Sequence, residues 1–544
     1  MSIKEHCIIS EFSNKKVRSY VRFFLAAIKE DNMKDQSVIY DLLVIGGGIN
    51  GTGIAADASG RGLNVLLCEM NDLASSTSSN SSKLIHGGLR YLEHYEFRLV
   101  REALAERETL LKNAPHIIWP LRFRLPHRRH LRPSWMIRIG LFMYDNLAKR
   151  ATLKGSHGIK FGKNSPVIDS ITKGFEYSDA WVDDARMVVL NAIAARDKGA
   201  NIMTRTRCSN AKRVDNIWEV TLHDNLTGQQ QTVKAKALVN AAGPWVTSFF
   251  DDALKITSPK KIRLIKGSHI IVPRIHNEPQ AYILQNEDKR IVFVIPYEDD
   301  FSLVGTTDIE HIGDPATASI SKEESDYLVS IVNAHFKHQI TTEDIVATYS
   351  GVRPLLDDES DSAAEVTRDY TFEVDAPDGK APLLSVFGGK ITTYRKLSEA
   401  AVDGIISHFP KAGKSWTANA ALPGGNFDTQ HNLQTSLQRQ YNWLPRKIIN
   451  RYVRSYGTLS HEICAGISSM DEMGQNFGAG LYQREVEYLI VKEWAVDLED
   501  IIWRRSKLGL HLTQVEKDTL ASFLVASTDS LKASSKQNSL SEKV

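Results

Sequence analysis

Residues 41–53 read Asp-Leu-Leu-Val-Ile-Gly-Gly-Gly-Ile-Asn-Gly-Thr-Gly, an apolar run that passes directly into a glycine-rich turn. The glycines at 46, 48 and 51 have the G-x-G-x-x-G spacing, which permits a tight turn, close approach to a pyrophosphate and close packing of a helix on a strand. A helix starting near Ile49 would direct its unpaired N–H groups and its dipole toward an anion. The same spacing also occurs in ordinary turns, but a strand before it and helix formers after it favour a dinucleotide-binding βαβ unit with Gly46, Gly48, Ile49, Asn50 and Gly51 in contact with the cofactor.

A second apolar run, residues 64–68, ends at Glu69. Glu69 lies 18 residues after Gly51, the place where an acidic acceptor holds a ribose hydroxyl in this type of unit. An acid at this position favours an unphosphorylated ribose. The pattern therefore predicts FAD or NAD as the cofactor, in preference to NADP.

Length and composition set limits on the rest of the molecule. The chain has 544 residues, 42% hydrophobic and 24% charged, which is typical of a globular protein with two or three domains. A net charge of +2 gives no indication of a nucleic-acid partner. The four cysteines form no C-x-x-C pair, so we expect neither a disulfide framework nor a metal site, and a reducing compartment is favoured. No apolar run approaches the length needed to span a bilayer, so any membrane contact is expected to be peripheral.

The two ends of the chain differ in composition from the middle. Residues 1–39 are predicted to be a flexible N-terminal extension, or to include sequence upstream of a true start at Met33; the basic and apolar stretch 15–29 could alternatively lie at a membrane interface. Residues 527–544 are rich in Ser and Lys and are predicted to form a disordered tail.

Two later segments are predicted to return to the same sheet. Residues 237–245 form an apolar strand ending in a small-residue turn, and residues 383–390 form a second one, followed by a helix from about residue 391. These segments supply surfaces for the far end of an extended cofactor, through Gly243, Trp245, Gly389, Lys390 and Thr392, and favour resident FAD over exchanging NAD. The expected fold is α/β, with a Rossmann-like FAD-binding domain formed by residues 40–115, 180–260 and 350–424, a mixed-sheet substrate-binding or cap domain formed by 116–179 and 261–349, and a C-terminal helical domain formed by 425–526.

Several separated motifs resemble one family of flavoproteins. They are the pattern Ile45-Gly46-Gly47-Gly48-x-x-Gly51-x-Gly53-x-Ala55-x-Asp57-x-x-x-Arg61-Gly62, the runs at residues 81–91, 263–269 and 349–355, and the pattern Gly388-Gly389-Lys390-x-x-Thr393-Tyr394-Arg395. Together they resemble the FAD-dependent glycerol-3-phosphate dehydrogenases, within the wider D-amino-acid-oxidase-like flavoproteins, strongly over residues 40–425 and more loosely beyond. Ser398 departs from the Ala usual in the family, and neither the calcium-binding loops of the mitochondrial members nor the large insertion of the oxygen-using relatives is visible.

The resemblance implies an activity and a location. Members oxidise sn-glycerol 3-phosphate to dihydroxyacetone phosphate with FAD and pass the electrons to a membrane quinone, so we expect a cytoplasmic enzyme peripheral on the inner face of the cytoplasmic membrane. An oxidase that uses oxygen and makes peroxide is an alternative. A non-catalytic binding module on the same fold is a third interpretation, which predicts a colourless protein.

Oxidation of a secondary alcohol needs a hydride acceptor, a base for the hydroxyl proton and an anchor for the phosphate. The anchors suggested by the motifs are Arg90, Arg353, Arg368 and Lys390, because Arg forks and Lys ammonium groups bind phosphate oxygens. His269 is the preferred base, with His86 positioning flavin or substrate and Tyr91 hydrogen-bonding the substrate; His86, or a Lys or Arg of depressed pKa, remains an alternative base. The catalytic set is therefore His269, Arg353, Lys390 and His86. Further contacts with FAD are expected from the Ser/Thr-rich segment and the turn after it, through Ser75, Thr77, Ser81, Ser82, Lys83, His86 and Gly88.

Residues 119–150 interleave arginines with tryptophan and long apolar side chains. This mixture suits contact with anionic lipid, although an internal helix with a solvated charged face or a nucleic-acid patch would have a similar composition. Residues 425–526 show apolar spacing near 3.6, at 433–444 and 486–500, and by analogy could cap the molecule or form a homodimer.

Overall fold

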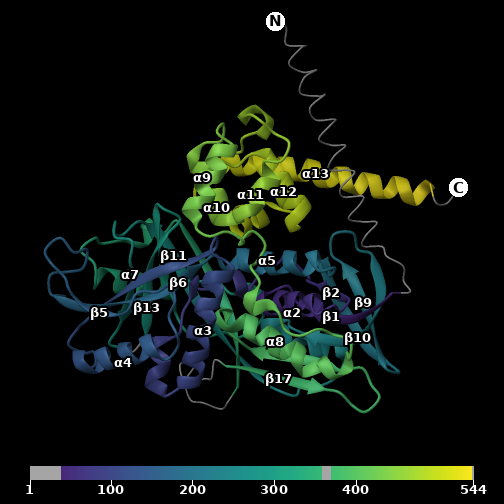
Figure 1. Ribbon diagram of the computed structural model, residues 1–544, viewed down its shortest axis with the longest axis horizontal. Coiled ribbons are helices and arrows are strands. Elements are labelled where there is room, and N and C mark those ends of the chain that lie inside the picture. Colours follow the sequence, from purple (N-terminus) through teal and green to yellow (C-terminus); the bar gives the residue numbers. More distant parts are fainter. Residues whose placement is uncertain (1–37, 289, 358–368, 542–544) are drawn as a thin grey trace, which may run out of the picture. The chain divides into compact units, whose positions relative to one another are not determined.

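The computed structural model describes residues 38–288, 290–357 and 369–541. The chain divides into two compact units, one formed by Tyr40–Thr429 and the other containing the segment from Gln430 onward. The larger unit contains two β-sheets with helices packed on them (Figure 1). The predicted N-terminal extension, up to residue 37, and Arg368 lie outside the described residues.

The first sheet is the predicted nucleotide-binding sheet. Its strands follow the order β17-β18-β10-β1-β2-β7, with β9 paired to β10 and β8 to β9. The pairs β1–β2, β2–β7 and β10–β18 are parallel, as crossover connections require. The strand bounds are β1 Ile39–Ile45, β2 Val65–Cys68, β7 Asn201–Met203, β8 Thr206–Val214, β9 Ile217–Asp224, β10 Gln230–Asn240, β17 Tyr370–Asp375 and β18 Leu383–Gly388.

The glycine-rich turn has the predicted form. Gly46 has a φ of +108°, and a Cβ placed on Gly51 would lie 1.9 Å from the Gly46 carbonyl oxygen, so only glycine permits this approach. Helix α2 (Ile49–Gly60) starts directly after the turn and packs against α5 (Asp184–Asp197) and α8 (Tyr394–Ile405). The βαβ unit and both return strands are therefore confirmed.

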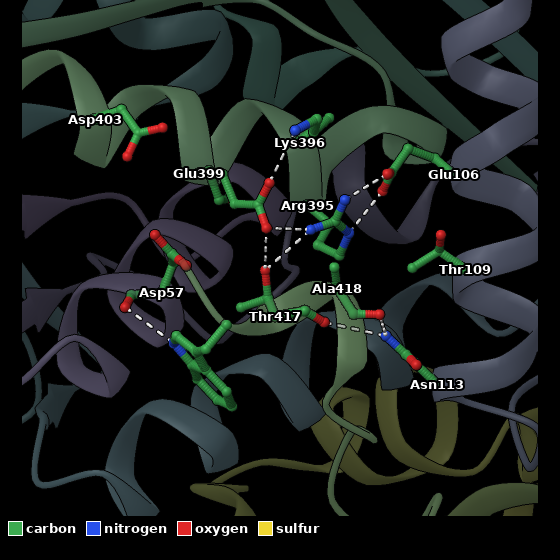
Figure 2. Close-up of polar contacts among 12 residues, drawn as sticks. Asp57, Glu106, Thr109, Asn113, Arg395, Lys396, Glu399, Asp403, Thr417 and Ala418 are labelled. Atoms are coloured by element: carbon green, nitrogen blue, oxygen red, sulfur yellow. Dashed lines mark hydrogen bonds and ion pairs between the residues drawn. The ribbon is translucent and has the colours of Figure 1, made fainter. Parts of the chain in front are cut away.

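A buried ionic network holds α8 against α3 (Phe97–Asn113) (Figure 2). Arg395, at the start of α8, donates to both carboxylate oxygens of Glu106 on α3, at 2.8 and 2.5 Å, and also bonds to Glu399. Thr417 donates to Glu399 at 3.1 Å, which adds the segment after α8 to the network. Nearby, Arg61 at the end of α2 pairs with Asp57 at 2.7 Å and Asp403 at 2.5 Å. The network thus fixes α8, which begins just after the segment 388–392, against α3.

The second sheet follows the order β15-β11-β14-β13-β12-β4-β6-β3, with β16 paired to β11 and β5 to β6. Valine, isoleucine and leucine side chains from its centre pack with α7 (Lys322–Asn333) into a core that excludes water. Helix α4 (Ser134–Asn146) belongs to the same unit. The strand bounds are β3 Leu84–Ile85, β4 Ile118–Pro126, β5 His157–Lys160, β6 Lys173–Val182, β11 Ile262–Pro273, β12 Ala281–Gln285, β13 Ile291–Tyr297, β14 Phe301–Gly305, β15 Ile309–Glu310 and β16 Ala347–Leu356.

The strand positions differ from the expected segment limits in one respect. Strand β16 pairs with β11 over its whole length, from Ala347 to Leu356, and so lies entirely in the second sheet. The expected boundary between the two domains, at residue 350, falls inside this strand. The return to the first sheet therefore begins later, with β17.

The segment from Gln430 is helical, as expected. Its helices are α9 Gln430–Gln440, α10 Arg446–Tyr456, α11 Ser460–Ile463, α12 Gln483–Glu493 and α13 Gln514–Ser541. Helix α13 continues through most of the segment for which disorder was expected, because alanine and leucine within the Ser- and Lys-rich stretch are good helix formers. Among the described residues, no helix combines the length and hydropathy needed to cross a bilayer.

Candidate active site

A cavity of about 1020 Å³ extends along the ends of the first-sheet strands and reaches the face of the second sheet. It is lined by residues from both, including Gly46 and Glu69 at one end and Phe293 and Arg353 at the other. Ligands of open α/β sheets bind at such strand ends.

The nucleotide end of the cavity is formed by the glycine turn and Glu69. The Glu69 carboxylate accepts hydrogen bonds from the N–H groups of Gly47, at 2.6 Å, and Asn71, at 2.8 Å. Burial raises the pKa of Glu69, and these two hydrogen bonds oppose that shift. Gly48, at the N-cap of α2, provides no side-chain cap of its own, and the first turn of the helix borders the cavity with the Ile49 N–H already bonded to Ser78. These residues fit the pyrophosphate and ribose of a dinucleotide.

The Ser/Thr-rich segment lines the cavity, but its side chains mainly fix its own conformation. Ser78 accepts from the Ile49 N–H at 3.0 Å, Thr77 donates to the Val352 carbonyl at 2.6 Å, and Ser81 donates to Asp184 at 2.7 Å. Ser75, Thr77, Ser81 and Ser82 border the cavity as predicted. Ser78 was missed, because hydroxyl spacing does not reveal which one meets the helix end.

Lys83 was expected to contact the cofactor and does not border the cavity. Its ammonium group is buried, 2.8 Å from the Asp184 carboxylate and 2.9 Å from the Ser79 carbonyl. A buried Lys needs such partners, so Lys83 holds the serine segment in place instead. No local pattern indicates this pairing, since Asp184 lies 101 positions away in the chain.

Another part of the cavity wall is formed by the turn at 86–91 and by the segment that precedes α8. His86, Gly88, Arg90 and Tyr91 border the cavity, and so do the return-segment residues Gly243, Trp245, Gly389, Lys390 and Thr392. The Lys390 ammonium lies 3.8 Å from the Tyr91 ring centroid, a cation–π contact. Gly388 and Gly389 have φ values of +77° and +100°, which place backbone against the cavity without a Cβ.

Three of the four predicted phosphate anchors border the cavity, namely Arg90, Arg353 and Lys390. Arg353 forms an ion pair with Asp308 and donates to Thr306 Oγ1 at 3.2 Å. Asp308 and Thr306 also border the cavity and were not singled out from the sequence. The nitrogen donors of Arg90, Arg353 and Lys390 suit an anionic group.

His269, the predicted base, is buried and does not border the cavity. Its Nε2 lies 3.0 Å from the Ser82 hydroxyl, which does border it, and its ring stacks on Tyr349 with centroids 4.7 Å apart. Burial, with Arg353 and Lys83 nearby, holds the pKa of His269 well below its ordinary value. The two predicted histidines therefore differ in their access to the cavity. His86 borders the cavity directly, whereas the Ser82 hydroxyl lies between His269 and the cavity.

The segment 119–150 contains two different structures. Its first part is β4, an internal strand in which Phe123 is buried and borders the cavity. Arg122 and Arg124 pair with Glu176 on the neighbouring strand. These two arginines are therefore engaged within the sheet, whereas the sequence pattern had included them in a lipid-binding stretch. Its second part is α4, on which Trp135, Met136, Ile139 and Phe142 are exposed.

Among the described residues, no group of three His, Cys, Asp or Glu side chains is arranged to hold a metal ion. The first turn of α2 at the cavity, the glycine contacts at 46 and 389 and the volume of the cavity all fit an extended dinucleotide such as FAD.

Comparisons with known proteins agree with this geometry. The profile of the family described as FAD dependent oxidoreductase matches residues 41–395, and that of the C-terminal domain of alpha-glycerophosphate oxidase matches residues 415–538. The chain is 57% identical to a glycerol-3-phosphate dehydrogenase of Pseudomonas aeruginosa, over 89% of this chain and 95% of that protein. It is 55% identical to the aerobic glycerol-3-phosphate dehydrogenase of Escherichia coli, over 90% and 98%, and 49% identical to a D-erythritol 1-phosphate dehydrogenase of Brucella abortus, over 88% and 96%. A crystal structure of glycerol-3-phosphate dehydrogenase from Bacillus halodurans complexed with FAD is similar with a TM-score of 0.70 and 25% identity, over 94% of this chain and 98% of that one.

Proposed function

Because the chain belongs to the FAD-dependent oxidoreductase family, in its glycerol-3-phosphate dehydrogenase branch, we propose that it oxidises sn-glycerol 3-phosphate to dihydroxyacetone phosphate and passes the electrons to a membrane quinone. FAD, when bound, supplies the acceptor for the hydride. The observation that carries the proposal is the cavity itself, which combines dinucleotide-binding features at one end with an anion site at the other.

Arg90, Arg353 and Lys390 hold the substrate phosphate in this proposal. All three border the cavity, and their nitrogen donors match the oxygens of a phosphate dianion. Arg368 carries the same role by resemblance to the family. With the phosphate fixed, the carbon that bears the reacting hydroxyl is held in a defined orientation, which lowers the entropic barrier to reaction.

The hydroxyl proton leaves toward an imidazole. His269 is neutral because its pKa is depressed, and it reaches the cavity only through Ser82, so proton transfer to it passes through the Ser82 hydroxyl. His86 borders the cavity directly and is the alternative base. The substitution His269→Asn distinguishes the two candidate bases. It should abolish the acidic limb of the dependence of kcat on pH only if His269 accepts the proton.

Helix α4 supports the proposed contact with lipid. Trp135, Ile139 and Phe142 follow one another at helical spacing and are 63%, 50% and 62% exposed, while Leu141 and Tyr144 on the same helix are buried. Arginines before and within the helix, at 128, 129, 132 and 138, favour an anionic membrane, consistent with a peripheral enzyme on the inner face of the cytoplasmic membrane.

The test is anaerobic bleaching of the purified protein. A yellow holoprotein should lose its visible absorbance on addition of sn-glycerol 3-phosphate and recover it on addition of a quinone analogue. A colourless protein, or a yellow one that glycerol 3-phosphate fails to bleach, would contradict the proposal. D-erythritol 1-phosphate, tested in parallel, establishes which polyol phosphate is preferred, and peroxide yield in air identifies an oxidase.

A further inference from the structure

A buried hydrogen-bond network lies behind the turn that carries His86. The hydroxyl of Tyr144, on α4, accepts a hydrogen bond from the Gly87 N–H at 2.8 Å and donates to Asp179, on β6, at 2.7 Å. Arg107, on α3, pairs with Asp179 at 2.5 Å and donates to the Ser178 carbonyl at 3.0 Å. Arg107, Tyr144 and Asp179 are each about 2% exposed, so three separate elements meet at one buried point.

The turn is fixed on both sides by these contacts. Strand β3 ends at Ile85, so pairing within the sheet does not extend to Gly87. A Cβ on Gly87 would lie 2.6 Å from Leu104 Cδ2 and 2.8 Å from the Tyr144 hydroxyl, which shows how closely the backbone approaches this wall. On the other side, the His86 N–H and Thr392 Oγ1 are 3.4 Å apart. Residues 86–88 are therefore held between Tyr144 and the first turn before α8.

Such a network is a costly way to fill a core. Burying a carboxylate, a guanidinium and a hydroxyl requires desolvation that an apolar cluster of similar volume avoids, so stability alone gives little reason for it. A directional network instead fixes the orientation of the groups that it binds. Here it fixes the Gly87 N–H. Gly87 directly follows His86 and lies three residues before Arg90, and both of these side chains border the cavity.

We propose that Tyr144, Asp179 and Arg107 are positioning residues for the reaction, which fix the Gly87 N–H and thereby the placement of His86 and Arg90. Tyr144 and Arg107 do not border the cavity and act through the turn, whereas Asp179, which joins them, also borders the cavity; Tyr144 is therefore the member whose substitution tests the positioning role. The proposal rests on the proposed oxidation of glycerol 3-phosphate, since the two placed side chains serve that reaction.

The chain contains a matched control for this network. In the C-terminal unit, the Tyr456 hydroxyl donates to Glu485 at 2.6 Å, and Arg451 donates to the second oxygen of the same carboxylate at 2.6 Å. Tyr456 is fully buried, like Tyr144, but its triad lies within the helices α10 and α12. Replacing either tyrosine by phenylalanine removes the same hydroxyl from the same chemical setting.

The experiment compares Tyr144→Phe with Tyr456→Phe as FAD-loaded, full-length proteins. We measure amide hydrogen exchange of peptides covering residues 84–92 and steady-state kinetics with glycerol 3-phosphate and a soluble dye. Tyr144→Phe should raise exchange at this turn about ten-fold and lower kcat about 10- to 100-fold, with KM changed less than about three-fold and flavin content unchanged, because misplacing a reacting group mainly affects the transition state. Tyr456→Phe should alter neither quantity.

Three results would overturn the proposal: unchanged exchange at residues 84–92 in Tyr144→Phe, faster exchange with normal kcat, or an equal loss of kcat in both variants. Asp179→Asn, which keeps the side-chain volume, should reproduce the loss of kcat. If the wild-type protein does not oxidise glycerol 3-phosphate, the proposed function fails by itself, whereas the exchange measurement still reports whether Tyr144 holds the turn.

Discussion

One sequence motif, Gly388–Arg395, contributes cations to two regions with opposite electrostatic settings. Lys390 borders the cavity and contacts the Tyr91 ring, whereas Arg395, five residues later, is enclosed by Glu106, Glu399 and Thr417 in the buried network (Figure 2). Lys390 faces a cavity, whereas hydrogen-bond acceptors surround Arg395. The difference shows that the surroundings of a cation in the motif, more than the motif itself, decide whether it lines the cavity or stabilises the fold.

The largest effect is expected from breaking the network. Arg395→Met removes the cation from between two carboxylates that are about 6–7% exposed and leaves them uncompensated. We expect the free energy of unfolding to fall by about 3–5 kcal/mol, measured by denaturant titration of the holoprotein. Lys396→Met is the control, because Lys396 pairs with the same Glu399 but is half exposed, and it should cost less than about 1 kcal/mol. Equal losses would show that Arg395 is not a structural cation.

The next effect concerns the cavity. Arg353→Ala should lower kcat/KM for glycerol 3-phosphate about 100-fold, mainly by raising KM, because it removes a charged donor to the phosphate. Flavin content should stay near one per chain and stability should change little. Arg263→Ala, on the neighbouring strand β11 and outside the cavity, is the control and should leave kcat/KM within about three-fold. Loss of flavin from Arg353→Ala would place Arg353 in the cofactor site instead.

A smaller effect is expected in the pH dependence of the free energy of unfolding, through the buried carboxyl of Asp57 beside the network. Burial raises the pKa of Asp57 to about 6, although Arg61 beside it acts in the opposite direction. A carboxyl that binds its proton more tightly when folded stabilises the protein at low pH, and this contribution is lost as pH rises from about 4 to about 6. The loss amounts to about 2–3 kcal/mol for a shift of this size. Asp57→Asn should remove this component from the pH dependence of unfolding; an unchanged profile would contradict it.

The smallest effect on the folded enzyme is expected at α4. The double substitution Trp135→Ser and Phe142→Ser should weaken binding to phosphatidylglycerol vesicles by about ten-fold or more, because each aromatic ring contributes buried apolar area at the interface. Dye-linked activity in solution should not change. Val515→Ser, at an exposed position on α13, is the control for loss of exposed apolar surface. Vesicle binding that is unaffected in the double variant would exclude α4 as the lipid contact.

Much of the fold could be predicted because its signals are local. The glycine spacing at 46–51, Glu69 and the return strands ending near Gly243 and Gly388 all lie where the sequence placed them. Periodicity also identified the helical C-terminal segment. These features depend on backbone conformation and on apolar patterns, which neighbouring residues determine.

The errors concern pairings between distant residues. Lys83 was assigned to the cofactor because nothing near it in sequence reveals Asp184, 101 positions away. Arg122 and Arg124 were included in the candidate lipid-contact segment because the strand that carries Glu176 is formed about fifty residues later. The Ser82 hydroxyl between His269 and the cavity likewise depends on the register of separate segments. The role of a charged side chain can therefore be predicted from sequence only when its ion-pair or hydrogen-bond partner is close along the chain.

The order of strands in the first sheet also bears on biosynthesis. Gly46, which borders the cavity, is among the first described residues to leave the ribosome, while Lys390, which also borders it, follows most of the larger unit. Strand β18 must pair beside β10 before the part of the wall that contains Lys390 exists. A nascent chain that has not yet been synthesised as far as residue 390 therefore has only part of the cavity wall. Long-range strand pairing of this kind is also slow. Stable capture of the flavin is consequently a late event in the life of each new chain, and truncations before β18 should accumulate as colourless protein.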